Sequence, residues 1–209
     1  MNHLSLFSGI GGATEAIRQA GLDCKTIAFS EINQSTIKMY RALHGHDAED
    51  LGDISSVGFD TLYGMKGVDI LTAGFPCQSF SRMGKGLGWN CERLKSTINS
   101  VKRTVKLTVP RYILIENVRA ITQKPHDVGF NDLLSWFKVV GYNHSLHVGN
   151  PRDFGYLQSR SRVFVALSRE DQDPWVLPKQ IKMSKQKFVK DPMASVSKNC
   201  YKINPKRAK

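Results

Sequence analysis

Cys77 is the first residue whose type and setting could support chemistry. It lies in Gly-Phe-Pro-Cys-Gln-Ser-Phe-Ser, residues 74–81, directly after an apolar run at 68–73. A thiol in a loop after a strand, near free backbone amides, can have its pKa lowered from roughly 8.5 and act as a nucleophile. The alternative is a packing cysteine, but Pro76, Gln78, Ser79 and Ser81 are typical of an exposed loop. We therefore predict that Cys77 is a nucleophile.

A carboxylate follows a second apolar run. Glu116 and Asn117 end the segment Tyr-Ile-Leu-Ile-Glu-Asn-Val at 112–118. A carboxyl group in a partly apolar pocket tends to have a raised pKa and can share a proton with a ring nitrogen of a substrate. The alternative is an acidic residue at the start of a helix.

Two arginines are spaced for joint action in Gln-Ser-Arg-Ser-Arg, residues 158–162. At a spacing of two, Arg160 and Arg162 lie on one side of an extended segment. They could bind phosphate or brace the carboxylate and the cysteine loop.

A glycine-rich turn precedes these segments. Phe7, Gly9 and Gly11 belong to Phe-Ser-Gly-Ile-Gly-Gly at 7–12, and Glu31 follows 19 residues after the last of these glycines. Glycines allow a ligand to approach the backbone, and an acid at this distance can accept hydrogen bonds from a ribose diol. The pattern indicates a nucleoside ligand, with a purely structural turn as the alternative.

Gly-Asp-Ile at 52–54 adds a second acid. Asp53 could accept from an exocyclic amine while Ile54 lies against a purine face; the alternative is a turn residue. The glycine turn lacks the Lys-Ser/Thr ending of a phosphate-binding P-loop.

The elements that must position these residues alternate between β-rich and amphipathic segments. This alternation predicts βαβ units, a parallel sheet and an α/β, Rossmann-like doubly wound fold. The predicted strands are 3–7, 25–30, 68–73, 112–115, 145–148 and 162–167, and the predicted helices are 13–20, 35–43, 93–107 and 132–140.

Charge divides the chain unevenly. Of the net charge of +12, residues 1–173 carry +3 and residues 174–209 carry +9. We predict a catalytic domain at 1–173 and a basic tail or arm at 174–209, with a polyanionic partner such as nucleic acid. The four cysteines form no CxxC pair, and no signal peptide or membrane-spanning run is evident, so we expect a reduced, cytoplasmic protein that is not in a membrane.

Taken in order, these segments resemble the DNA cytosine-5 methyltransferases. The resemblance covers residues 3–168 and rests on the glycine turn, the strand-end Glu, Gly-Asp-Ile, Gly-Phe-Pro-Cys-Gln, Glu-Asn-Val and Gln-x-Arg-x-Arg. It implies transfer of a methyl group from S-adenosyl-L-methionine to C5 of a cytosine flipped out of double-stranded DNA, as in restriction-modification.

The resemblance also implies a role for each residue. Cys77 would attack C6 of the cytosine, making C5 nucleophilic, and Glu116 would hold N3 and the exocyclic amine. Asn117 would order the strand end, and the arginines would position Glu116 and backbone phosphates. The cofactor would be held by Phe7, Gly9, Gly11, Glu31, Asp53 and Ile54, and the substrate by Pro76, Gln78, Ser79, Ser81, Asn117 and Gln158.

The chain departs from the family in two places. Only 41 residues follow Ser168, where family members carry a target-recognition region and two closing motifs, and Met193–Val196 is only faintly similar to the closing Asn-Ser-Val. Residues 90–94 lack the glycine of the family's Arg-Gly-x-Leu-Phe.

Three functions stay open on this basis. The chain is a small, active DNA cytosine-5 methyltransferase, the catalytic subunit of a split enzyme whose second protein chain reads the target, or an inactive DNA-binding remnant. Methylation of RNA by the same chemistry is a further alternative.

Overall fold

A computed structural model describes residues 1–76, 80, 88–154 and 156–175. Most of these residues, 1–149 and 161–175 with the gaps named, form one compact unit, and residues 150–160 belong to a second. The basic tail predicted from residue 174 lies almost wholly outside the described residues and stays a prediction. No helix in the described part of the chain is long and apolar enough to cross a membrane.

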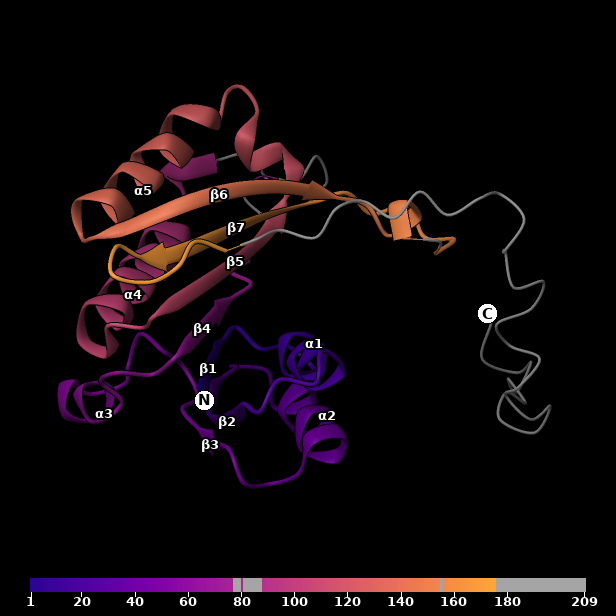
Figure 1. Cartoon of the computed structure of the whole chain (residues 1–209), viewed down its shortest axis with the longest axis vertical. Helices are drawn as coiled ribbons and strands as arrows, with labels where there is room; N and C mark the ends of the chain where they lie inside the picture. Colours follow the sequence, from indigo (N-terminus) through magenta and orange to yellow (C-terminus); the bar gives the residue numbers. More distant parts are fainter. Residues whose placement is uncertain (77–79, 81–87, 155, 176–209) are drawn as a thin grey trace. The chain divides into compact units, whose positions relative to one another are not determined.

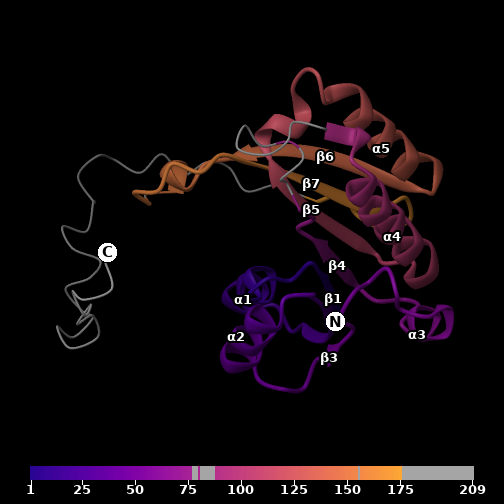
Figure 2. The same cartoon turned by 180° about the vertical axis from the view of Figure 1, so that it is seen from behind.

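A seven-stranded sheet forms the centre of the larger unit, in the order β3-β2-β1-β4-β5-β7-β6 (Figure 1). α1 and α2 lie on one face, and α3, α4 and α5 on the other, as both views show (Figures 1 and 2). The strands are β1 (Asn2–Leu6), β2 (Lys25–Ser30), β3 (Glu49–Asp50), β4 (Ile70–Ala73), β5 (Tyr112–Val118), β6 (Tyr142–Gly149) and β7 (Arg162–Arg169). The helices are α1 (Gly12–Gln19), α2 (Gln34–His44), α3 (Phe59–Gly64), α4 (Glu92–Thr108) and α5 (Asp127–Val139).

The predicted α/β class is confirmed, and the parallel expectation is correct for five strands. β3, β2, β1, β4 and β5 are parallel, whereas β7 is antiparallel to both β5 and β6. The expected parallel sheet is therefore a mixed sheet, with its antiparallel pairs at this end. Residues 150–161 connect β6 to β7 with a single 3-10 turn (Pro151–Phe154) and no crossover α-helix among the described residues, so β7 runs back antiparallel beside β6.

The core follows from apolar spacing on the central strands and on α4. Leu4, Leu71, Ile113 and Leu167 are completely buried on the adjacent strands β1, β4, β5 and β7. On α4 the buried apolar residues recur every three or four positions, which places them on the face toward the sheet. They are Leu94, Ile98, Val101 and Val105.

A buried histidine ties three central strands together. His3 on β1 is 0% exposed, and its Nδ1 and Nε2 hydrogen-bond the Oγ1 atoms of Thr26 and Thr72, each at 2.9 Å. Burial disfavours the charged ring and lowers the pKa of His3 to about 4. The ring is therefore neutral in the folded protein at neutral pH.

This histidine predicts loss of stability in mild acid. Unfolded chains protonate a histidine near pH 6.5, but folded His3 resists protonation until about pH 4. The free energy of unfolding should therefore fall by about 3 kcal/mol in total as the pH drops from 6.5, and it should level off near pH 4. Urea unfolding of wild type and His3→Gln at pH 7 and pH 5 measures the difference. An equal loss in both proteins would contradict the assignment.

Candidate active site

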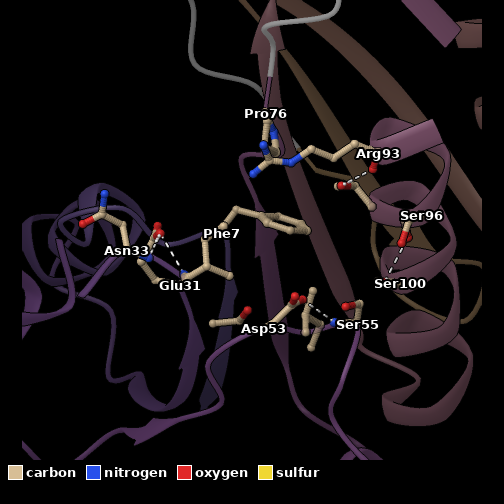
Figure 3. Close-up of a pocket in the computed structure, with 13 residues that line it drawn as sticks. Phe7, Glu31, Asn33, Asp53, Ser55, Pro76, Arg93, Ser96 and Ser100 are labelled. Atoms are coloured by element: carbon tan, nitrogen blue, oxygen red, sulfur yellow. Dashed lines mark hydrogen bonds between the residues drawn. The ribbon is translucent and has the colours of Figure 1, made fainter. Parts of the chain in front are cut away.

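A cavity of about 440 Å³ opens at the carboxyl ends of β1, β2 and β4 and is closed on one side by α4. Its size is in the range of small-molecule sites. Figure 3 shows side chains from the turn after β1, the end of β2 and the segment after β3 around it. The lining residues are Phe7, Ser30, Glu31, Ile32, Asn33, Asp53, Ile54, Ser55, Pro76, Arg93, Ser96, Thr97 and Ser100.

Glu31 is fixed by backbone amides on both carboxylate oxygens. The amide of Gly9 donates to Oε2 at 3.0 Å, and the amides of Ile32 and Asn33 donate to Oε1 at 2.9 Å each. These bonds set the direction of the carboxylate without using all its lone pairs. The remaining acceptor sites can receive a hydroxyl pair such as a ribose diol.

The turn after β1 has the left-handed backbone that its glycines favour. Gly9 and Gly11 have φ of 55° and 90°, and Phe7 has φ of 54°. A positive φ is uncommon for a bulky residue and indicates local strain. It accompanies the placement of the Phe7 ring in the cavity wall, whereas Gly11 lies at the start of α1 and takes no part in the lining.

Asp53 and Ile54 form another part of the wall. Asp53 Oδ1 accepts from the amide of Ser55 at 2.9 Å, which leaves Oδ2 available, and Ile54 is buried. A carboxylate oxygen beside an apolar side chain suits the amine and the face of a purine. The cavity thus brings together Phe7, Glu31, Asp53 and Ile54, four of the six residues predicted to bind the cofactor.

A carboxylate and a guanidinium meet where β5 and β7 lie side by side. Arg162 Nε is 2.7 Å from Glu116 Oε1, and the two side chains are 16% and 39% exposed. Arg162 pairs with Val118 in the register, so it lies diagonally across from Glu116 on the same face of the sheet. The predicted contact between these two residues is present.

The start of the cysteine loop is held against the same strand end. Asn117 Nδ2 donates to the carbonyl of Phe75 at 3.1 Å. A Cβ built on Gly74 would lie 3.8 Å from Glu116 Oε2, so the carboxylate is close to the backbone where the loop begins. Pro76 continues into the wall of the cavity.

Several predicted residues are not tested by these contacts. Cys77, Gln78, Ser79 and Ser81 lie outside the described residues. Gln158 and Arg160 belong to the second compact unit, where the amide of Arg160 donates to Asn150 Oδ1 at 3.4 Å. Their roles stay predictions.

Comparison with known proteins agrees with this geometry. Residues 1–207 match the family of C-5 cytosine-specific DNA methylases. The chain belongs to this family. The orphan methyltransferase M.Rho11sI of Bacillus phage rho11s is 36% identical to this chain over 182 residues, which cover 84% of the chain and 35% of the phage protein. The type II methyltransferase M.NgoBI of Neisseria gonorrhoeae is 34% identical over 180 residues, which cover 85% of the chain and 53% of that protein.

Solved structures share the fold of this chain. The methyltransferase EhMeth of Entamoeba histolytica has a TM-score of 0.72 at 20% identity, with 88% of the chain and 57% of EhMeth covered. S. pombe Dnmt2 methyltransferase has a TM-score of 0.64 at 24% identity, and the match covers 84% of this chain and 53% of the Dnmt2 chain. The chain therefore spans about a third to a half of the curated relatives named above and somewhat more than half of these structures.

Sequence reasoning missed one wall of the cavity. Arg93, Ser96, Thr97 and Ser100 on α4 line it, together with Asn33 and Ser55 from other elements. The four α4 residues are spaced by three, one and three, so they share one face of the helix. That polar stripe on a helix following the cysteine loop was the available signal.

Proposed function

We propose that this chain carries the catalytic half of a DNA cytosine-5 methyltransferase that uses S-adenosyl-L-methionine. The observation that carries the proposal is the Glu116–Arg162 ion pair, 2.7 Å long, beside the first residues of the Gly-Phe-Pro-Cys loop. It places a carboxylate of fixed direction next to the loop that holds the predicted nucleophile. Family membership supports the same chemistry.

The cavity supports the choice of cofactor. Two carboxylates, Glu31 and Asp53, suit a ribose diol and an adenine amine, while Ile54 and Phe7 offer apolar surface to the purine. Pro76 extends the cavity wall to the residue before Cys77. When bound, S-adenosyl-L-methionine would supply an electrophilic methyl group on its sulfonium.

The chain's own residues would then act on a flipped cytosine in the following order. The Cys77 thiolate would add to C6 while the protonated Glu116 carboxyl group gives its proton to N3 and accepts a hydrogen bond from the exocyclic amine, which offsets the negative charge that builds on the ring. C5 would then accept the methyl group as the bond from that group to the sulfonium breaks and leaves a neutral thioether. Removal of the C5 proton by a base lets the Cys77 sulfur leave and restores the ring. Arg162, which contacts Glu116 Oε1, would keep the carboxyl group directed at N3.

Trapping with 5-fluorocytosine DNA tests this proposal. Fluorine at C5 cannot be removed as a proton, so the covalent adduct should persist through denaturing electrophoresis with wild type plus S-adenosyl-L-methionine. Cys77→Ala should give no adduct, and Cys24→Ala should trap like wild type. An adduct formed by Cys77→Ala would show that Cys77 is not the nucleophile.

A split enzyme is the second candidate, because the chain covers only 35% and 53% of the two curated relatives. In that case a second chain would read the DNA target, and the isolated chain would bind S-adenosyl-L-methionine without methylating DNA. Methylation of one defined sequence by the isolated chain would contradict the split form. Absence of methylation with every added partner would favour a DNA-binding remnant.

Arg93 gives a prediction about the amino-acid end of the cofactor. It is the one guanidinium among the described lining residues, opposite two carboxylates, and its side chain extends toward Pro76 (Figure 3). We expect Arg93→Ala to weaken S-adenosyl-L-methionine binding about tenfold, because a charge-assisted hydrogen bond to the ligand carboxylate is lost. Binding of methylthioadenosine, which lacks that carboxylate, should not change.

Calorimetric titration of both ligands measures this difference. Lys95→Ala, two residues away on α4 and paired with Glu92 at 2.7 Å, is the matched control and should bind both ligands like wild type. Equal weakening of both ligands by Arg93→Ala would contradict a role at the carboxylate.

A further inference from the structure

A second concave surface lies along the later half of α4, and we call it the α4 groove. It encloses about 430 Å³ and combines side chains of α3, α4 and α5: Phe59, Asn99, Lys102, Arg103, Lys106, Leu107 and Trp136. α4 returns the chain from the end of β4 to the start of β5, so its last turns lie toward the opposite edge of the sheet from Glu116. The groove is therefore separate from the candidate active site.

No ion pair among the described residues neutralises the two lysines of the groove. The ammonium groups of Lys102 and Lys106 lie 5.2 Å and 5.8 Å from the ring centroid of Trp136. Like charges four residues apart on a helix repel each other. Of the described lining residues none is acidic, and neither lysine is within 4.0 Å of a carboxylate in the described ion pairs.

Lys102 is also partly withdrawn from water. It is half-buried, and loss of hydration is the main cause that lowers its pKa; Asp132 raises the pKa, and Lys106 lowers it by a smaller effect. Arg103 is also half-buried and donates one hydrogen bond to the carbonyl of Ile54 at 2.7 Å. An anion between the lysine head groups would relieve their repulsion and replace lost hydration.

Aromatic surface lies beside these cations. Phe59 is 59% exposed and Tyr63 is 50% exposed, and their rings stack with centroids 5.4 Å apart and an angle of 12° between their planes. Lys66 Nζ lies 5.5 Å from the Tyr63 centroid. A solvated helix face alone would explain the lysines but not the exposed rings of Phe59 and Tyr63 on α3 beside them, opposite the partly buried ring of Trp136 on α5.

We propose that the α4 groove binds a strand of nucleic acid. Lys102 and Lys106 contact backbone phosphates, and a base lies against Phe59 or Trp136. Alternating cations and aromatic faces are the features with which proteins hold single strands without reading their sequence. An acidic peptide would use the cations but has no planar group for the exposed rings, so the observations favour nucleic acid.

Salt dependence of binding tests the proposal. Fluorescence anisotropy of a labelled single-stranded oligodeoxythymidine would be measured over a range of salt concentrations with the full chain. In Lys102→Gln/Lys106→Gln the slope of log K against log salt should be shallower by about 1.4, and affinity at about 0.1 M salt should fall about 25-fold. Circular dichroism and urea unfolding verify that the variant is folded.

Lys25→Gln/Lys38→Gln is the matched control, because it removes the same charge from exposed positions on β2 and α2. It should keep the wild-type slope. Equal changes in both variants would overturn the proposal, since they would report overall charge alone.

Photocrosslinking supplies a readout that net charge does not affect. An oligonucleotide carrying 5-iodouracil should crosslink to the peptide containing Phe59 or Trp136, and Phe59→Ser should remove the crosslink at residue 59. No crosslink on either peptide would overturn the proposal. Competition provides a further outcome. If poly-glutamate, but not single-stranded DNA, binds more weakly to Lys102→Gln/Lys106→Gln than to wild type, the proposal is overturned in favour of an acidic protein partner.

Discussion

Replacing Glu116 with Gln should reduce methyl transfer to DNA by about 10²–10⁴-fold, the usual loss when a positioned acid–base group is removed. The amide can still accept a hydrogen bond from the cytosine amine, but it cannot carry the proton for N3 or pair with the charge of Arg162. Single-turnover transfer of labelled methyl groups measures the loss. Affinity for S-adenosyl-L-methionine should stay at the wild-type value, because Glu116 does not line the cavity.

A matched control separates this role from a general effect of removing charge. Glu170→Gln breaks another ion pair, with Lys138 at 2.9 Å, on exposed side chains. It should leave methyl transfer unchanged. If both variants transfer methyl groups at the wild-type rate, Glu116 is not the group that holds N3.

Replacing Gly11 with Ala should destabilise the fold by about 3 kcal/mol or more, since a left-handed backbone and overpacking each cost on the order of 1–3 kcal/mol. Gly11 has φ of 90°, and its added Cβ would clash with the His44 ring and lie 2.9 Å from Tyr40 Cε2. His44 cannot move away freely, because its Nε2 hydrogen-bonds the carbonyl of Ile10 at 3.0 Å. Urea unfolding measures the effect.

Gly21→Ala isolates the backbone contribution. Gly21 has φ of 66° but nothing within 4 Å of an added Cβ, so its substitution should cost only about 1 kcal/mol. Equal destabilisation by the two alanines would show that the contact of α1 with α2 is not tightly packed at Gly11.

The sequence was most informative where chemistry and secondary structure coincide. The strand over 25–30 has the predicted bounds, and the prediction that the run at 68–73 lies mid-sheet is correct, because β4 is the central strand. Glu31 and Asp53 were found because acids at strand ends stand out against apolar runs. Their convergence on one cavity follows from parallel strands ending at one edge.

Tertiary contacts explain what the sequence could not predict. α5 begins at Asp127 rather than 132, although Gly129 disfavours a helix. A Cβ at Gly129 would lie 2.5 Å from Trp89 Cγ, so only glycine fits where the indole packs on the first turns.

β3 is two acidic residues, Glu49 and Asp50, and its pairing with β2 gives no apolar signal. The cavity-lining residues of α4 could be recognised only after the position of this helix in the fold was known.

The reversed direction of β7 determines where a recognition module could be attached by design. Gly149, Arg162 and Val118 align in the register, so β6 ends and β7 begins at the edge where Glu116 lies. The eight residues of β7 then carry the chain about 25 Å to the far edge. A module inserted between β6 and β7 would leave from and return to the catalytic edge, whereas one fused after Arg169 would need a linker that spans the sheet.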